Sequence, residues 1–260
     1  MIRRIPAFLL LAAAVTTLAG ACGGSVPGPA LTDPTAIVTA ALKSTEAAKS
    51  VHLDAAVDGT ATVTLPMLGG TGAPIDLTGT TASANIDFAA KAAKATFSVA
   101  KYGIAGELIA VGGKAYVKTS MTGPLYQETA TEDTPVDPTN AGDLIDNLGD
   151  LLLKPGVVLV KGDDVACGSK SCYTVTTDLT PDQLGLTGNA AVGGLPVDVT
   201  GASLHMTVRV EKDLPYHLAG VSAVLSMANA STVKLELTAS KWDEPVTIDA
   251  PPANQVKPAS

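Results

Sequence analysis

Aromatic residues are scarce in this chain, whose 260 residues include three Phe, five Tyr and one Trp. Alanine, valine, threonine and glycine dominate instead, which favours strands with small side chains over a core built around large rings. Basic residues are also few: 17 Lys and Arg stand against 25 Asp and Glu, for a net charge of −8. An acidic body is repelled by phosphate groups, so we expect no nucleic-acid partner.

The sequence also lacks the motifs that carry covalent chemistry. It contains no Gly-x-Ser-x-Gly elbow, no phosphate-binding glycine loop and no His-Glu-x-x-His pair. His52, His205 and His217 are scattered, and the strand contexts of two of them favour exposed, hydrogen-bonded side chains over a base or a ligand. We therefore expect no catalytic residue, no metal site and no cofactor.

The first 21 residues have the pattern of a secretory signal peptide. Arg3 and Arg4 precede an apolar stretch at residues 5–15, and small residues lead up to Cys22. The apolar stretch is shorter than the roughly 18 residues that suggest a membrane-spanning helix. The pattern predicts export and cleavage before Cys22.

Cys22 is expected to carry a lipid anchor. It follows Leu18-Ala19-Gly20-Ala21, which places Leu one residue further from Cys than in the usual bacterial lipobox. The alternative is an ordinary signal peptide beside an unpaired cysteine, which would be an odd thiol in an oxidising compartment. Two or three acyl chains would hold the protein stably on the extracytoplasmic face of the cell membrane.

The other two cysteines, Cys167 and Cys172, are separated by four residues. In an exported chain this spacing favours a local disulfide that closes a hairpin loop. A redox site would prefer the tighter Cys-x-x-Cys spacing, and a zinc site would need further ligands nearby.

The remaining chain is predicted to form a flexible tether at residues 22–32 and one domain at residues 33–260. A first helix begins at Pro34 with Asp33 as its N-cap. A second helix is indicated by apolar residues at helical spacing, ended by Pro155-Gly156. These apolar residues are Leu144, Ile145, Leu148, Leu151 and Leu152.

Most of the domain is predicted to be antiparallel sheet, because its strands are joined by short glycine turns. The first group of strands is expected at residues 52–55, 75–88, 95–100, 104–111 and 115–119. The last group, at 204–210, 221–227 and 233–239, alternates apolar and polar residues, so each strand has one face for apolar contact. A short helix is expected at 180–184 and a flexible segment at 185–196.

Several segments resemble a family of actinobacterial cell-envelope lipoproteins, the LppX/LprA/LprF/LprG family. They are Ser50-Val51-His52-Leu53, Gly112-Gly113-Lys114-Ala115-Tyr116-Val117, Asp137-Pro138, Ser240-Lys241-Trp242-Asp243-Glu244-Pro245-Val246-Thr247-Ile248 and Pro251-Pro252. The resemblance implies an α+β fold: a strongly curved antiparallel half-barrel with helices on the concave side around an apolar cavity. It also implies binding of an acylated lipid or glycolipid and its transfer across the envelope, with a lipid transporter as partner.

Eight apolar residues are candidates for lining such a cavity: Ala95, Phe97, Val99, Leu148, Leu152, Val208, Leu225 and Leu235. Each of them is equally compatible with an ordinary packed core. The predicted function is therefore a membrane-anchored lipid carrier without covalent chemistry. The alternative is a structural or adhesive surface lipoprotein with a filled core that acts through protein contacts.

Overall fold

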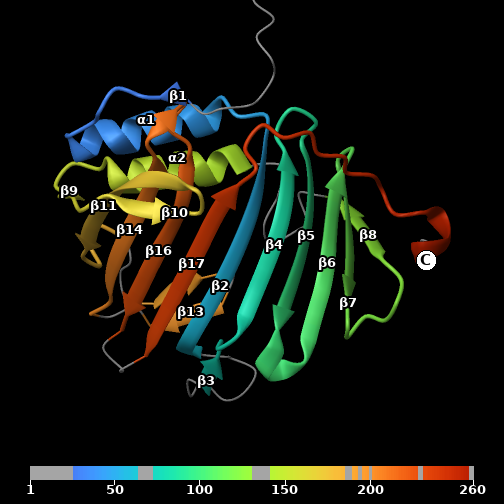
Figure 1. Cartoon of the computed structure of the whole chain (residues 1–260). Helices are drawn as coiled ribbons and strands as arrows, with labels where there is room; N and C mark the ends of the chain where they lie inside the picture. Colours follow the sequence, from blue (N-terminus) through green and yellow to red (C-terminus); the bar gives the residue numbers. More distant parts are fainter. Residues whose placement is uncertain are drawn as a thin grey trace, which may run out of the picture.

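The computed structural model describes residues 26–63, 73–130, 141–184, 189–192, 195–198, 201–227 and 231–257. Its main feature is a curved antiparallel sheet that does not close on itself (Figure 1). The strands follow one another in the order β10-β11-β14-β16-β17-β2-β4-β5-β6-β7-β8. The strands from β10 to β17 form one half of the sheet and those from β2 to β8 form the other, each in the order of the sequence. The pairing of β17 with β2 joins the two halves.

The strands of this path have the following bounds: β2 Ser50–Val63, β4 Thr80–Asp87, β5 Ala92–Val99, β6 Ile104–Val111, β7 Lys114–Thr119, β8 Gln127–Ala130, β10 Val165–Cys167, β11 Lys170–Leu179, β14 Ser203–Glu211, β16 Leu218–Ser226 and β17 Thr232–Ser240. Short strands flank it: β1 Val26–Pro27, β3 Ala73–Asp76, β9 Val160–Lys161, β12 Asn189–Val192, β13 Leu195–Asp198 and β15 Asp213–Leu214.

Two helices, α1 (Pro34–Glu46) and α2 (Ala141–Leu152), lie together across one end of the sheet (Figure 1). The carboxylate of Asp33 accepts hydrogen bonds from the backbone N–H groups of Thr35 and Ala36, and so caps α1 as predicted. The helices approach closely at Gly149, where an added Cβ would lie 3.2 Å from Leu42 Cδ1. None of the described helices is long and apolar enough to span a membrane.

The cross-strand register sets which residues share a face of the sheet. One row runs through every strand from β11 to β6: Val175, Val208, Val221, Leu237, Ala55, Ala82, Phe97 and Gly106. Directly opposed residues point to the same side. Because Val175, Val208 and Val221 pack with α1 and α2 in the main core, this whole row faces the helix side.

The tether predicted at residues 22–32 is held against the body from Val26 onward. Strand β1 pairs with β15, and the Gly28 N–H donates to the Lys212 carbonyl. The Tyr216 hydroxyl donates to the Pro29 carbonyl, 2.8 Å away, and the Leu31 N–H donates to the Tyr173 hydroxyl at 3.0 Å. The chain therefore reaches α1 along a fixed path.

Three predicted elements differ from the structure. The strand predicted at 75–88 is divided into β3 and β4 by a turn, in which the Asp76 carboxylate accepts from the Thr78 N–H. The helix predicted at 180–184 is a single turn, in which the Thr180 N–H donates to the Gln183 side chain and the Leu184 N–H donates to the Thr180 carbonyl. The segment at 185–196, predicted to be flexible, contains β12 and the start of β13.

Candidate functional site

The helix side of the sheet is mostly apolar, with Thr177 and Thr80 as polar residues in the row beside the one defined above, and the described helices cover only part of it. In the row defined above, Val175 and Val208 are 1% and 2% exposed, whereas Ala82 at the other end is exposed. The next row repeats this gradient, because Met206 is 5% exposed and Leu235 is 37% exposed. The part that no described helix covers consists of β17, β2, β4, β5 and β6.

We call this uncovered part the open apolar face. Its apolar members are Ala55, Val57, Ala82, Phe97, Val99, Ile104 and Leu235, with Gly106 at its edge and Thr80 between Val57 and Val99. A Cβ at Gly106 would collide with the Phe97 ring, so the glycine lets that ring lie flat across β6. The result is a surface of aliphatic residues around one aromatic ring.

Between the helices and the sheet, by contrast, side chains fill the space. A cavity of about 20 Å³ remains there, which is room for about one water molecule. Leu148 and Leu152 from α2 and Val208 from β14 are among the side chains that line it. This end of the domain is a packed core.

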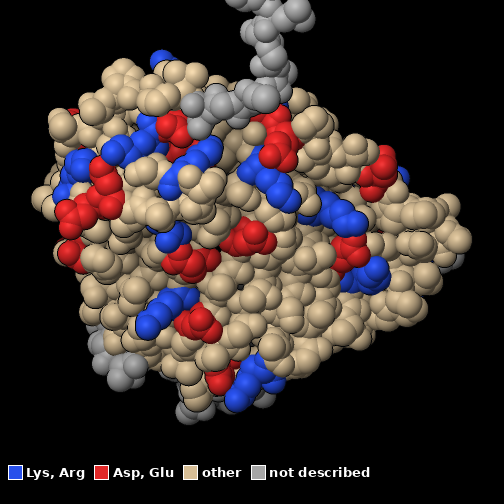
Figure 2. Space-filling model, in the orientation of Figure 1, with Lys and Arg blue, Asp and Glu red and all other residues tan. Residues whose placement is uncertain are grey.

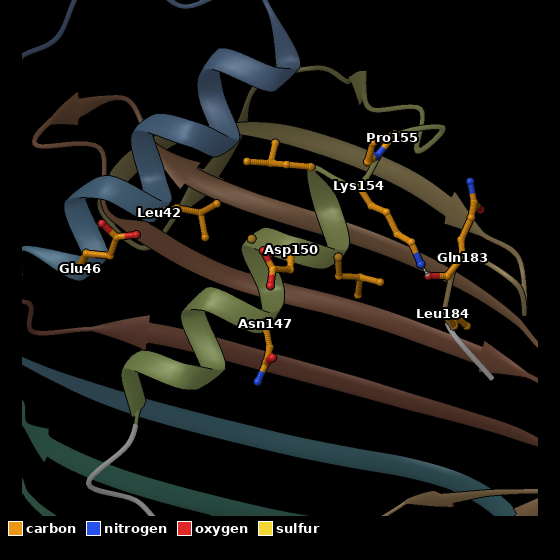
Figure 3. A pocket seen from close by; sticks show the side chains of 11 residues that line it. Leu42, Glu46, Asn147, Asp150, Lys154, Pro155, Gln183 and Leu184 are labelled. Atoms are coloured by element: carbon orange, nitrogen blue, oxygen red, sulfur yellow. Dashed lines mark hydrogen bonds between the residues drawn. The ribbon is translucent and has the colours of Figure 1, made fainter.

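A larger groove, of about 870 Å³, lies on the solvent side of the two helices (Figure 3). Leucines and polar side chains share its walls, among them Leu42, Asn147, Asp150 and Lys154. The Lys154 ammonium donates to the Gln183 carbonyl, 3.0 Å away, which ties α2 to the turn after β11. Leu42 lines both this groove and the small inner cavity, so its side chain separates the two.

The structure separates the eight predicted lining residues. Six lie on the helix side of the sheet by register: Ala95, Phe97, Val99, Val208, Leu225 and Leu235. Leu152 joins Val208 in the packed core, and Leu148 packs against it. Phe97, Val99 and Leu235 belong to the open apolar face, and Leu225 packs against a separate small cluster of Ala202 and Met227. Their role in lipid binding stays a prediction.

The predicted disulfide between Cys167 and Cys172 is formed, with a Cα–Cα distance of 6.0 Å. It closes the hairpin between β10 and β11. Cys22 and the signal peptide at residues 1–21 lie outside the described residues, so lipidation and cleavage stay predictions. Within the described ranges, no group of three or more His, Cys, Asp or Glu is placed to hold a metal ion.

The histidines differ in their surroundings. His52 bonds to Asn85 and Asp54, and His205 to Asp178, so these two are satisfied surface side chains as predicted. His217 is 6% exposed and carries a ring nitrogen without a hydrogen-bond partner. Sequence reasoning missed this buried histidine, because its position two residues after a proline gives no signal of burial.

Comparison with known proteins identifies relatives by structure alone: no family model and no curated protein matches the sequence. The crystal structure of LprF from Mycobacterium bovis matches over 88% of this chain and 99% of its own, with 17% identity and a TM-score of 0.57. The lipoprotein LppX from Mycobacterium tuberculosis matches over 84% of this chain and all of its own, at 18% identity and a TM-score of 0.42.

The match with LprF extends over nearly the whole length of both chains, so it describes the complete fold rather than one motif. The curved, unclosed antiparallel sheet with helices on one side is the α+β architecture that the sequence resemblance implied. The chain therefore has the fold of LprF, one of the lipoproteins after which the family that its sequence resembles is named.

Proposed function

We propose that this protein is a lipid-binding lipoprotein of the LppX/LprA/LprF/LprG family, which holds acyl chains against the open apolar face and carries them across the cell envelope. The observation that supports the proposal is the incomplete cover of an apolar sheet surface. Leu235 is 37% exposed on a strand face whose other residues are apolar. Water-exposed apolar area of this kind is stabilised by an apolar ligand.

The dimensions of the face suit an acyl chain. Strand β17 has nine residues, so it extends over about 30 Å at 3.4 Å per residue, comparable to a long extended acyl chain. Each methylene that leaves water contributes about 0.8 kcal/mol. The groove of Figure 3 suits the polar part of the lipid, because Asn147, Asp150 and Lys154 stand beside leucines there.

Binding is proposed to involve no covalent chemistry. The protein would be exported and held by an acylated Cys22 on the extracytoplasmic face of the membrane, where a transporter exchanges lipid with it. This arrangement needs a reversible apolar site and no catalytic group.

The filled space between helices and sheet favours a second candidate, the structural or adhesive lipoprotein. A cavity of about 20 Å³ cannot hold an acyl chain unless α1 and α2 separate from the sheet. This candidate predicts a protein without bound lipid that takes up none.

Two tryptophan substitutions on opposite faces of the same sheet test the proposal. Ala82 is exposed on the open apolar face, so Ala82→Trp should fill that surface without disturbing the core. Ala105 is exposed on β6 and points to the other face, so Ala105→Trp is the matched control. The probe is a phospholipid with a pyrene-labelled acyl chain, and folding is checked by circular dichroism.

We expect Ala82→Trp to lower pyrene-lipid loading at least tenfold, and Ala105→Trp to load as the wild type does. Loss in Ala105→Trp alone would place the chains on the opposite face and contradict the proposal. A wild-type protein that takes up no labelled lipid, and that carries none in native mass spectrometry after purification from its host, would reject lipid binding and support the structural candidate.

A further inference from the structure

A second cleft, of about 710 Å³, lies on the face of the sheet away from the helices. Arg209 and Glu211 contribute to it, and they alternate along β14 with Val208 and Val210, which pack in the helix-side core. The disulfide loop at residues 167–170 forms one wall, and Lys241 and Trp242, which follow β17, form another. The Cys167–Cys172 bond therefore shapes a site rather than an isolated turn.

Six charged residues line this cleft: four of them form two ion pairs, and the other two, Lys241 and Glu244, have opposite charges. The Lys170 ammonium lies 2.6 Å from the Glu211 carboxylate, and the Arg209 guanidinium pairs with the Glu236 carboxylate. The Ser222 hydroxyl donates to the other oxygen of Glu236. Figure 2 shows the same pattern over this face, where acidic and basic side chains lie beside one another. The cleft therefore presents many polar atoms and little net charge.

Gly220 lies directly opposite Arg209 and leaves space for its side chain. A Cβ at Gly220 would lie 2.7 Å from Arg209 Nη2, so the absence of a side chain leaves room for the guanidinium beside β16. There it pairs with Glu236.

His217 is a buried polar group in the cleft that lacks a partner. Its side chain is 6% exposed, and Nε2 has no hydrogen-bond partner among the described residues. Two carboxylates stand just beyond bonding distance: Asp243 Oδ2 is 3.7 Å from Nε2, and Glu211 Oε2 is 4.0 Å from Nδ1. A buried nitrogen without a partner is costly, so a ligand group that bonds to it is stabilised.

The histidine ring also stacks on Trp242, with 4.9 Å between ring centroids and 18° between planes. The indole N–H donates to the Leu218 carbonyl at 3.0 Å, which fixes the indole ring. Burial lowers the pKa of His217, and so does the nearby Lys170 charge, against the opposing effect of Glu211 and Asp243. The ring is therefore neutral near pH 7, with one donor and one acceptor.

We propose that this cleft binds a neutral, polyhydroxylated ligand, namely a sugar or a short sugar chain. Hydroxyl groups both donate and accept, so they can bond to His217 and to the outer atoms of the Lys170–Glu211 and Arg209–Glu236 pairs without separating them. At either ion pair, an ionic ligand would have to compete with the partner already in place. The volume lies within the usual range for small-molecule sites.

This site is independent of the proposed lipid-binding function, because it lies on the opposite face of the sheet. The protein would therefore have an apolar binding surface on one side of the sheet and a polar binding site on the other.

Trp242 provides the readout, since it is the one tryptophan in the sequence. Its indole N–H gives a single, unambiguous side-chain resonance in a ¹H–¹⁵N spectrum. The probes are glucose, mannose, galactose, maltose and sucrose at millimolar concentration, with inorganic phosphate as the charged comparison. We expect at least one neutral sugar to shift the Trp242 resonance saturably, and phosphate to leave it unchanged.

His217→Phe keeps an aromatic ring against Trp242 but removes both nitrogens, so it should weaken sugar binding at least tenfold. The control is His205→Phe. His205 lies on the same face of β14 as Arg209 but outside the cleft, so this variant should bind sugar as the wild type does. Should His217→Phe fail to fold, Glu236→Gln tests the same site, because that side chain is 46% exposed and can be changed without unfolding the core.

A saturable shift that persists unchanged in His217→Phe, or in Glu236→Gln, would overturn the assignment. So would a cleft that responds to phosphate and to none of the neutral sugars. Sugar binding should survive Ala82→Trp, and loading of the pyrene lipid should survive His217→Phe, so failure of either proposal leaves the other standing.

Discussion

Burial of His217 predicts that the folded protein loses stability as the pH falls below about 6.5. Its side chain is 6% exposed, and loss of hydration on burial lowers the pKa of the imidazole below its ordinary 6.5. Between pH 6.5 and the lower folded-state pKa, the imidazole binds a proton in the unfolded chain but not in the folded chain. Stability is therefore complete above pH 6.5 and declines as the pH falls toward the folded-state pKa.

The size of the effect is limited by the single proton involved. One proton changes the folding equilibrium by at most about tenfold per pH unit. Urea unfolding followed by Trp242 fluorescence, between about pH 7.5 and pH 5, measures the slope. Asp164 does not interfere, because hydrogen bonds from Lys212 and Lys161 lower the pKa of its carboxyl, and the stability it contributes is lost only below its ordinary value of 3.8.

His217→Gln should remove this slope, whereas His205→Gln, on the solvent-exposed part of β14, should retain it. A wild-type stability that stays flat between pH 7 and pH 5, or an unchanged slope in His217→Gln, would show that the ring is hydrated in solution. Burial would then not lower the pKa of His217 in the folded protein.

Two further outcomes are expected. Replacing Cys167 and Cys172 by alanine removes a link with a sequence separation of 5, and loop-closure entropy gives a loss of about 2 kcal/mol in the free energy of unfolding; an unchanged urea midpoint would contradict this. Cys22→Ser should lack the mass of the acyl chains and should partition into the aqueous phase of a detergent separation, and identical behaviour of the native protein would reject the lipid anchor.

Local patterns in the sequence were sufficient to predict most elements of the fold. Asp33 and Pro34 mark the start of α1, and the strand predicted at 104–111 has the bounds of β6. Alternation also identifies the apolar face, since Phe97 and Val208 lie on one side of the sheet as expected. These features depend on residues close to each other in the chain.

Features that depend on distant contacts could not be predicted in this way. Alternation indicates which face is apolar but not how far α1 and α2 extend over it, so Val208 and Leu235 look alike in sequence and differ in exposure. The Tyr173 hydroxyl meets the Leu31 N–H across 142 residues, and no local pattern indicates that contact. The His217 cleft likewise combines the β10–β11 hairpin, residues of β14, β15, β16 and β17, and the segment after β17.

The docking of β1 against β15 has a consequence for a protein anchored at Cys22. Three residues separate Cys22 from Val26, so the link reaches at most about 14 Å even when fully extended. A linker of that length allows the body little rotation relative to the membrane. The anchored protein would keep one orientation, with the α1 end of the sheet nearest the headgroups. The opposite end of the sheet, where β2 ends and β4 begins, would point away from the bilayer (Figure 1).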